Sequence, residues 1–398
     1  AGPQGLQEGC RMERQERLIY LDNAATVFPK PARVLNKMME IYKSFGVSPG
    51  RGGYDLAVEA SDLVMDVREH LCRFFGSDDP ERVIFAANAS DALNLIIQGM
   101  IEPGCHVVSS QLEHNSVLRQ LHHFQRAGII TYDLAGFDGQ GHINPDVIAR
   151  MIKPSTRMVI INHASNVIGT VQDAQSIGNV CREHGVPLIL DVAQSAGLVP
   201  IDMCKWGVSV LAFTGHKSLL GPHGIGGAVI AKDMDIRITR FGGTGVDSES
   251  LEHTPTYPHR LETGTLNLIG VIGLGEGLKC VEEAGIDDTR KREVVLAQRL
   301  EKGLSEIPAV QIHGPSTWDN RLAVIMASLP DRVSEDVGAI LDGDYDIAVR
   351  TGLHCAPLAH EGLGTFPRGG VRFSIGPFNT VEDIEAAVCA MADIGRNK

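Results

Sequence analysis

Ala212-Phe213-Thr214-Gly215-His216-Lys217-Ser218-Leu219-Leu220-Gly221-Pro222-His223-Gly224-Ile225-Gly226-Gly227 contains one lysine between an apolar run and a glycine-rich turn. The apolar run, Val208–Phe213, has the composition of a buried strand, and the small residues beside Lys217 allow backbone to approach a ligand closely. A lysine in this setting is suited to forming a Schiff base with an aldehyde. Taken alone, it is far more often a surface lysine whose stem lies along apolar groups. The rest of the chain has to distinguish these two interpretations.

Buried strands and helices alternate along the first two thirds of the chain. Each expected strand is a short run rich in Val, Ile and Leu, and each expected helix has apolar residues at helical spacing. The expected strands are 18–21, 83–86, 106–109, 129–134, 158–161, 187–190 and 208–213. The expected helices are 31–45, 56–75, 92–97, 117–128, 145–152 and 174–184. This order predicts an α/β fold with a mostly parallel sheet covered by helices on both faces.

The last third of the chain has a different pattern. A loop that enters a helix spans 264–277, and long helices with weaker alternating strands follow it. We therefore expect a large domain over residues 20–265 and a smaller α+β domain over 266–398. Residues 1–19 are expected to be an N-terminal tail, of which residues 1–11 are either a flexible extension or a remnant foreign to the fold, because they precede Met12.

The composition is that of a soluble globular protein. The 398 residues are 43% hydrophobic, and 36 Lys and Arg against 49 Asp and Glu give a net charge of −13. Without a basic block, this balance argues against nucleic acid and against anionic membranes as partners. No metal site is expected, because His122 and His123 are adjacent and point to different faces of their helix.

The cysteines are scattered along the chain and form no Cys-x-x-Cys pair. They are Cys10, Cys72, Cys105, Cys181, Cys204, Cys280, Cys355 and Cys389. Such spacing favours reduced thiols over disulfides or zinc, so we expect a cytoplasmic protein.

Polar clusters follow four of the expected strands. They are Glu113–Asn115, Asn162–Asn166, Asp191–Gln194 and Thr214–Lys217. Ligands of parallel sheets bind beyond the carboxyl ends of the strands, so these clusters are expected to meet. Asp191 is of the type needed to pair with the protonated pyridine nitrogen of pyridoxal phosphate, although alone it could be a loop or capping acid.

The segment Asn88–Asp91 connects an expected strand directly to an apolar helix. The free N–H groups and the dipole of a helix N-terminus suit a phosphate group. The alternative is plain capping of the helix by Ser90 or Asp91. Lys217, Asp191 and the Ala89-Ser90 turn together supply an aldehyde anchor, a ring partner and a phosphate site, which predicts pyridoxal 5'-phosphate as cofactor.

Six motifs resemble, in order, those of the class V aminotransferase-fold cysteine desulfurases and selenocysteine lyases. They are Leu21-Asp22-Asn23-Ala24-Ala25, Glu113-His114-Asn115, Ser165-Asn166-Val167-Ile168-Gly169-Thr170, Asp191-Val192-Ala193-Gln194, Thr214-Gly215-His216-Lys217 and Arg350-Thr351-Gly352-Leu353-His354-Cys355-Ala356-Pro357. The resemblance extends from about Tyr20 to about Met391. It implies a pyridoxal-phosphate-dependent homodimer of fold type I.

The resemblance also implies a role for each matching residue. Lys217 looks like the Schiff-base lysine, Asp191 like the partner of the ring nitrogen, and His114 like the residue that stacks on the ring and assists proton transfer. The other implied cofactor contacts are Ala89, Ser90, Asn166, Gln194, Thr214, His216 and, from the second subunit, Thr265. The implied substrate contacts are Ala24, Asn166, Arg350 and Arg372, of which Arg372 resembles the clamp for the substrate carboxylate.

Cys355 determines which reaction is expected. By resemblance, its thiolate takes the sulfur of L-cysteine as a persulfide and L-alanine is released. His354 and Arg350 are potential cations beside it. The chain departs from the type II pattern at Leu353, where a first histidine is usual, and at Ala89-Ser90, where two threonines are usual. The short loop 355–366 implies limited reach, so a sulfur-acceptor protein is a further expected partner.

Two other classes of function stay open at this point. The chain could be a selenocysteine lyase, another C–S lyase, an epimerase or an aminotransferase that does not use Cys355. It could also be a non-catalytic sulfur-transfer scaffold, although the presence of Lys217, Asp191 and Arg372 argues against that.

Overall fold

A seven-stranded sheet forms the centre of the larger of two units in the computed structural model, which describes residues 18–50 and 52–396. The strand order is β2-β8-β7-β6-β5-β3-β4. The strands are β2 (Val83–Ala86), β3 (Cys105–Ser110), β4 (Ile130–Ala135), β5 (Thr156–Asn162), β6 (Leu188–Asp191), β7 (Val210–Thr214) and β8 (Gly226–Ile230). Strand β8 is antiparallel to both of its neighbours, and all other neighbouring strands are parallel. The predicted mostly parallel α/β sheet is confirmed.

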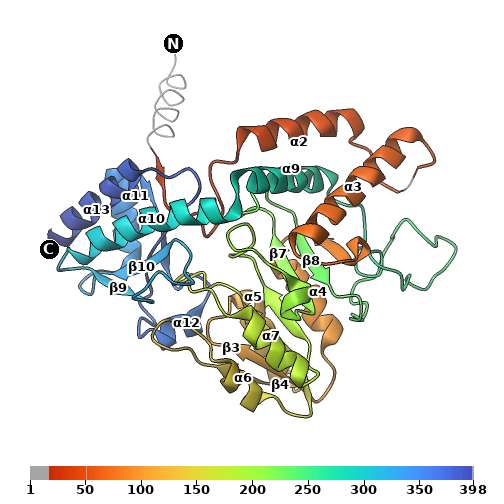
Figure 1. The fold of residues 1–398 in the computed structure, drawn as a ribbon, viewed down its shortest axis with the longest axis horizontal. Helices are drawn as coiled ribbons and strands as arrows, with labels where there is room; N and C mark the ends of the chain where they lie inside the picture. Colours follow the sequence, from red (N-terminus) through yellow and green to blue (C-terminus); the bar gives the residue numbers. More distant parts are fainter. Residues whose placement is uncertain (1–17, 51, 397–398) are drawn as a thin grey trace.

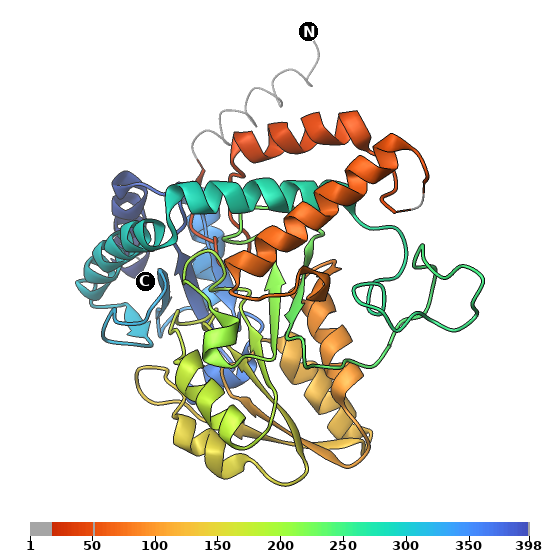
Figure 2. The ribbon, with the colours of Figure 1, turned by 45° about the vertical axis from the view of Figure 1, so that its right-hand side comes forward.

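Helices cover both faces of this sheet (Figures 1 and 2). Alternate residues of β5 are buried on opposite faces of the sheet. Val159 and Ile161 lie in one buried cluster, and Ile160 lies in the other. The first cluster includes side chains from α3 (Asp55–Phe74), α6 (Pro145–Met151), α7 (Ala174–Glu183) and α9 (Leu268–Ala284). The second includes side chains from α4 (Ala89–Met100) and α5 (Asn115–Arg126). Strands buried on both faces explain the continuous apolar runs in the sequence.

The smaller unit contains a four-stranded antiparallel sheet in the order β12-β13-β10-β9. Its strands are β9 (Gln311–His313), β10 (Val324–Ser328), β12 (Arg350–Gly352) and β13 (Gly370–Ser374). The helices of this unit are α10 (Ile286–Ser305), α11 (Ser334–Tyr345), α12 (Pro357–Gly362) and α13 (Val381–Arg396). The remaining elements of the chain are β1 (Ile19–Tyr20), α2 (Ala32–Phe45), η1 (Pro80–Arg82), α8 (Met203–Trp206) and β11 (Ile347–Ala348).

The packing differs from the expected division of the chain at two places. Helix α9, expected in the small domain, packs on α2 and α3 and shares the buried cluster of the large sheet (Figure 1). Strand β1 pairs with β11, although Ile19 was expected in the tail and Tyr20 in the large domain. Leu21, also expected in the large domain, lies in the core of the small unit. Of the expected tail 1–19, residues 1–17 lie outside the described residues.

Strand β8 was not expected, because its sequence begins within a glycine-rich turn. Glycine is required there by close packing: a Cβ atom at Gly227 would lie 2.0 Å from the carbonyl oxygen of Ile84 on β2. Some of the glycines that looked like part of a turn in the sequence are therefore strand residues, required by the close approach of two strands.

Three further observations concern the described part of the chain. Its seven cysteines are free thiols. Within residues 18–50 and 52–396, no three His, Cys, Asp or Glu side chains are grouped so as to hold a metal ion. None of the helices there has the length and apolarity needed to span a bilayer.

Candidate active site

A cavity of about 340 Å³ lies at the carboxyl ends of the parallel strands. Each of the four predicted polar clusters contributes to its wall, through His114, Asn162, Asn166, Asp191, Gln194, Thr214, His216 and Lys217. The wall also includes the predicted residues Ala24, Ala89, Ser90, Arg350 and Arg372. The sheet topology therefore brings together residues that are far apart in the sequence.

Lys217 lies in the turn that follows β7, with its side chain at the cavity wall. Burial lowers its pKa to about 8, and the negative charge of Asp191 opposes that shift. The peptide before the lysine is firmly held, since the His216 carbonyl accepts from the Thr26 hydroxyl at 2.9 Å, from the Val27 N–H at 3.2 Å and from Lys30 Nζ. A lysine with this pKa has a larger neutral fraction near neutral pH than an exposed lysine has, which favours its use as a nucleophilic amine.

Asp191 ends β6, the strand beside β7, and its carboxyl group is buried at the cavity. Its Oδ1 accepts a hydrogen bond of 2.9 Å from the Ala193 N–H. Burial raises the pKa of this carboxyl, while the Ala193 hydrogen bond and the charge of Lys217 lower it. A buried carboxylate of this kind is most stable opposite a cation.

The N-terminus of α4 forms another part of the wall. Asn88 caps the helix, because its Oδ1 accepts from the Asp91 N–H at 3.0 Å, so the alternative of a cap by Ser90 or Asp91 is wrong. Nearby, Thr214 Oγ1 and His216 Nδ1 are buried without a hydrogen-bond partner among the described residues. Unpaired buried polar atoms beside a helix N-terminus form a suitable environment for a bound anion.

His114 presents a neutral imidazole to the cavity. Burial is the main cause that lowers its pKa to about 4, with a further contribution from the positive charge of Lys217. Its Nδ1 accepts from the Ser116 N–H at 3.1 Å and lies 2.7 Å from the Ser116 hydroxyl, so the ring proton is on Nε2. The Ser116 hydroxyl is also hydrogen-bonded to that of Ser90, which links the His114 ring to the α4 turn.

Arg372 is fully buried in β13 and reaches the cavity between the two units. Its Nη2 lies 2.5 Å from Asp22 Oδ1, and its Nη1 donates to the Asn166 carbonyl at 3.0 Å. Its Nε and Asn166 Oδ1 are buried without a partner among the described residues. The guanidinium is therefore oriented by two contacts, and its Nε–H is among the N–H groups that stay available to a ligand.

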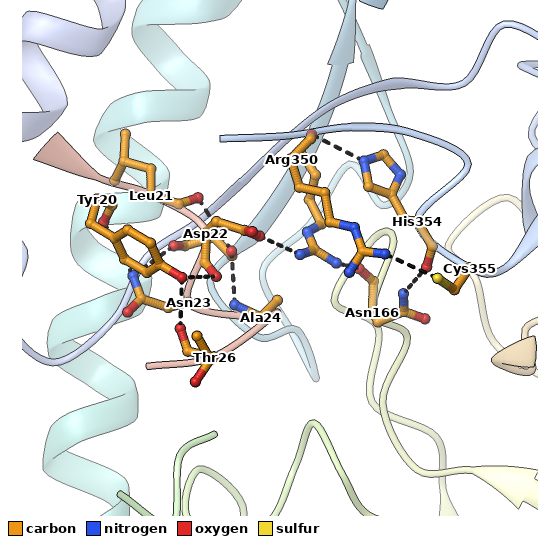
Figure 3. A network of polar contacts seen from close by, with 12 residues as sticks. Tyr20, Leu21, Asp22, Asn23, Ala24, Thr26, Asn166, Arg350, His354 and Cys355 are labelled. Carbon is orange, nitrogen blue, oxygen red and sulfur yellow. Dashed lines mark hydrogen bonds and ion pairs between the residues drawn. The ribbon is translucent and has the colours of Figure 1, made fainter. Parts of the chain in front are cut away.

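Cys355 is half-buried and does not belong to the cavity wall. Arg350 connects the two, because it lines the cavity and its Nη2 lies 3.0 Å from the Cys355 sulfur (Figure 3). The second expected cation, His354, is instead neutral, since burial is the main cause that lowers its pKa to about 2. Of these two neighbours of Cys355, Arg350 therefore supplies the positive charge.

Thr265 lies elsewhere in this single chain, in the wall of another cavity of about 310 Å³ that Arg68 and Glu262 also line. It was expected to reach the cofactor of a second subunit, and that expectation stays a prediction.

Two residues of the site were missed in the sequence. Ser116 lines the cavity, and Asp22 holds Arg372. Both lie inside or beside quoted motifs, so proximity to these motifs was the available signal. Their partners become evident only in the fold.

The comparisons with known proteins agree with this geometry. The sequence model of the aminotransferase class-V family matches residues 19–387. A probable cysteine desulfurase of Methanothermobacter thermautotrophicus is 32% identical over 373 residues, which are 92% of this chain and 92% of that protein. A probable cysteine desulfurase of Pyrococcus abyssi is 31% identical over 387 residues, which are 95% of this chain and 94% of that protein.

Solved structures are similar as well. An apo structure of a cysteine desulfurase from Thermococcus onnurineus NA1 has a TM-score of 0.89 at 29% identity and covers 96% of each chain. The cysteine desulfurase CsdA of Escherichia coli, in an S-sulfonic acid form, has a TM-score of 0.85 at 25% identity and covers 96% of this chain and 95% of its own. The chain therefore belongs to the class-V aminotransferase family and, within it, to the cysteine desulfurases.

Proposed function

We propose that this protein converts L-cysteine to L-alanine with the help of pyridoxal 5'-phosphate and transfers the sulfur to Cys355 as a persulfide. One observation carries the proposal: a single cavity contains Lys217, with its lowered pKa, and the buried Asp191, and Arg350 connects this cavity to the Cys355 sulfur. This arrangement combines an amine for an aldehyde, a partner for a ring nitrogen and a thiol within reach of one arginine.

The residues of the cavity fit the proposed cofactor. Lys217 would bond its aldehyde carbon, Asp191 would accept from its ring nitrogen, and the neutral His114 ring would lie against its face. Thr214 Oγ1 and His216 Nδ1, which have no partner among the described residues, would join the α4 turn in holding its phosphate. Gln194 would reach the ring hydroxyl. Bound there, pyridoxal phosphate supplies an electron sink for bond cleavage in the amino acid.

The substrate carboxylate would be held by Arg372 and Arg350. Both line the cavity, and Arg372 keeps its Nε–H free of partners among the described residues. A guanidinium suits a carboxylate because it donates two parallel hydrogen bonds. The free Asn166 Oδ1 only accepts, so it suits an N–H group of the substrate rather than the carboxylate. Ala24, which is also in the wall, leaves room beside them.

Cys355 would receive the sulfur as a thiolate. A new S–S bond forms between its Sγ and the substrate sulfur while the substrate C–S bond breaks. The electron pair of that bond stays with carbon, and a proton completes L-alanine. Cys355 is left as a persulfide. A thiol of a sulfur-acceptor protein or a small reductant must then take its outer sulfur.

We further propose a cytoplasmic homodimer. The position of Thr265 outside the cavity supports a second subunit, since its proposed cofactor contact can then be made only from the partner. Exposed apolar side chains on one helix, Leu35, Met39 and Tyr42 of α2, supply a surface for such pairing. The free cysteines support a reducing compartment.

Turnover of Cys355→Ser and Lys217→Ala tests the proposed function. Both alanine and sulfide are measured with L-cysteine as substrate. Loss of alanine formation in both variants is expected, whereas normal desulfuration by Cys355→Ser would overturn the persulfide step. Lyase activity that does not use Cys355 is a second candidate, because Cys355 lies off the cavity wall. It predicts that Cys355→Ser still cleaves L-selenocysteine.

A further inference from the structure

Three buried polar side chains next to Cys355 form a continuous hydrogen-bonded chain. His354 Nε2 lies 3.2 Å from the Arg350 carbonyl, and His354 Nδ1 lies 3.1 Å from His360 Nε2. The other ring nitrogen of His360 lies 2.8 Å from Thr365 Oγ1. The exposed fractions are 2% for His354, 0% for His360 and 8% for Thr365, so water does not compete strongly for these bonds.

The proton positions in this chain follow from its two ends. A carbonyl oxygen only accepts, so His354 Nε2 must carry a proton and donate to Arg350. His354 is neutral, because its pKa is lowered to about 2, so its Nδ1 accepts from His360 Nε2–H. His360 is neutral as well, with its pKa lowered to about 4 by burial, and its Nδ1 accepts from the Thr365 hydroxyl.

The reverse arrangement is excluded near neutral pH. If His360 donated to Thr365, its Nε2 would accept, and His354 would need protons on both nitrogens. That is the cationic form that the lowered pKa of His354 disfavours. The Thr365 hydroxyl also lies 3.3 Å from the His360 carbonyl, but that carbonyl already accepts from the Thr365 N–H at 2.9 Å and from the Phe366 N–H at 3.1 Å, which occupy its two lone pairs. All three links therefore donate in one direction, toward Arg350.

The hydrogen-bonded series of His354, His360 and Thr365 supports an unusual stretch of backbone. His354 and Cys355 have φ angles of 51° and 58°, the left-handed region that residues with a Cβ rarely adopt. Such strain persists only where the surroundings fix it. The His354 carbonyl accepts from Asn166 Nδ2 at 2.7 Å, and the Cys355 carbonyl accepts from the Asn115 N–H at 2.7 Å. These contacts hold the turn from the large unit.

The three-residue chain holds the same turn from the small unit. It runs from Thr365, through His360 on α12, to the backbone of Arg350 at the start of β12. The His354 and His360 rings are stacked with centroids 5.2 Å apart and planes at 25°. Both ends of the turn, Arg350 and Cys355, meet again through the 3.0 Å contact of Arg350 Nη2 with the sulfur.

We propose that His354, His360 and Thr365 are positioning residues that fix the turn from Arg350 to Cys355 and thereby hold the Cys355 sulfur beside the Arg350 guanidinium at the edge of the cavity. The proposal rests on the proposed function, because it assigns these residues to sulfur transfer. It leaves the binding of cofactor and substrate to the residues of the cavity wall.

Two matched pairs of variants test the proposal in the full chain reconstituted with pyridoxal phosphate. His360→Ala removes two links, whereas His360→Gln keeps a polar group near the His354 ring. Thr365→Val removes the hydroxyl at nearly constant shape, whereas Thr365→Ser keeps it. Val337→Ala, in the core of the small unit, controls for a general loss of stability.

The first measurement is sulfur transfer. His360→Ala should lower kcat for alanine formation about 10- to 100-fold, because a displacement near 1 Å suffices for such a loss. KM for L-cysteine should rise by a smaller factor, since Arg372 still holds the substrate carboxylate when Arg350 is displaced. Thr365→Val should show a smaller decrease in the same sense. His360→Gln, Thr365→Ser and Val337→Ala should remain within about threefold of the wild type.

The second measurement does not depend on activity. Amide hydrogen exchange over residues 353–356 should become about tenfold faster in His360→Ala and remain near the wild-type rate in Thr365→Ser and Val337→Ala. Wild-type exchange in His360→Ala, or equal loss of kcat in His360→Ala and Val337→Ala, would overturn the proposal. If the wild type forms no alanine, the proposed function fails. The exchange experiment still tests whether His354, His360 and Thr365 hold the turn from Arg350 to Cys355.

Discussion

Arg350 Nη2 lies 3.0 Å from the sulfur of Cys355, and the same side chain lines the cavity that contains Lys217. This contact is the link between the thiol and the cavity. One guanidinium can therefore serve two tasks, since it donates to the sulfur and faces the proposed substrate carboxylate.

Replacing Arg350 by lysine should impair both tasks. Lysine keeps the charge but loses the fork that reaches two acceptors at once. We expect KM for L-cysteine to rise about tenfold and kcat to fall by at least as much, measured as alanine formation. Arg368→Lys is the matched control, because Arg368 is an exposed arginine of the same unit that contacts the Pro330 carbonyl. Equal kinetics for the two variants would contradict the double role of Arg350.

Lys217 should make the apoprotein less stable near neutral pH. Its pKa is about 8 in the fold, against 10.5 for a lysine exposed to water, so the folded protein binds this proton less well than the unfolded chain does. The resulting loss of folding free energy is complete below pH 8 and disappears as the pH rises to about 10.5. At pH 7, the free energy of unfolding of Lys217→Met should therefore exceed that of the wild-type apoprotein by up to about 3 kcal/mol. Urea unfolding measures this difference.

The sign of this effect is checked by its pH dependence. The gap between Lys217→Met and the wild type should narrow between pH 8 and 10, because the folded wild type then no longer has to bury a charge. Lys232→Met, at an exposed lysine, should show no comparable gap. A gap that widens with rising pH would contradict the lowered pKa of Lys217.

The sequence predicted the elements around Lys217 and Asp191 well, because strands buried on both faces appear as continuous apolar runs. It could not place α9, whose residues are buried against α2, α3 and the large sheet. Apolar residues on all sides of a helix predict burial but do not identify the element that buries it. The neutral state of His354 was missed for a similar reason, since His360 and the rest of its surroundings become evident only in the fold.

Glu262 should be a major contributor to the stability of the large unit. Its carboxylate accepts from Arg68 Nη2 at 2.7 and 2.9 Å and from the Phe85 N–H at 2.6 Å, and both charged side chains are buried. Glu262→Ala leaves the Arg68 charge without a partner, so we expect a loss of about 3–5 kcal/mol in urea unfolding. Glu283→Ala, which removes the exposed partner of Arg33, should leave the transition almost unchanged. Similar shifts for both variants would count against a structural role of the buried pair.

Asp22 should tune Arg372 by neutralising part of its charge. Asp22 Oδ1 lies 2.5 Å from Arg372 Nη2, and Arg372 has no exposed surface. Asp22→Asn keeps the shape of the side chain and removes its charge, so the buried guanidinium loses its counterion. We expect a lower melting temperature for the apoprotein, because an unpaired buried charge is costly.

The same change should strengthen carboxylate binding. With the negative charge of Asp22 removed, Arg372 attracts an incoming carboxylate more strongly, so L-alanine should bind more tightly. Its binding should therefore raise the melting temperature of Asp22→Asn part of the way back to that of the wild type. Melting curves of the reconstituted protein with and without L-alanine measure both effects. Asp331→Asn, at an exposed acid of the same unit, is the control. If Asp22→Asn lowered the melting temperature but weakened L-alanine binding, Asp22 would orient Arg372 rather than attenuate its charge.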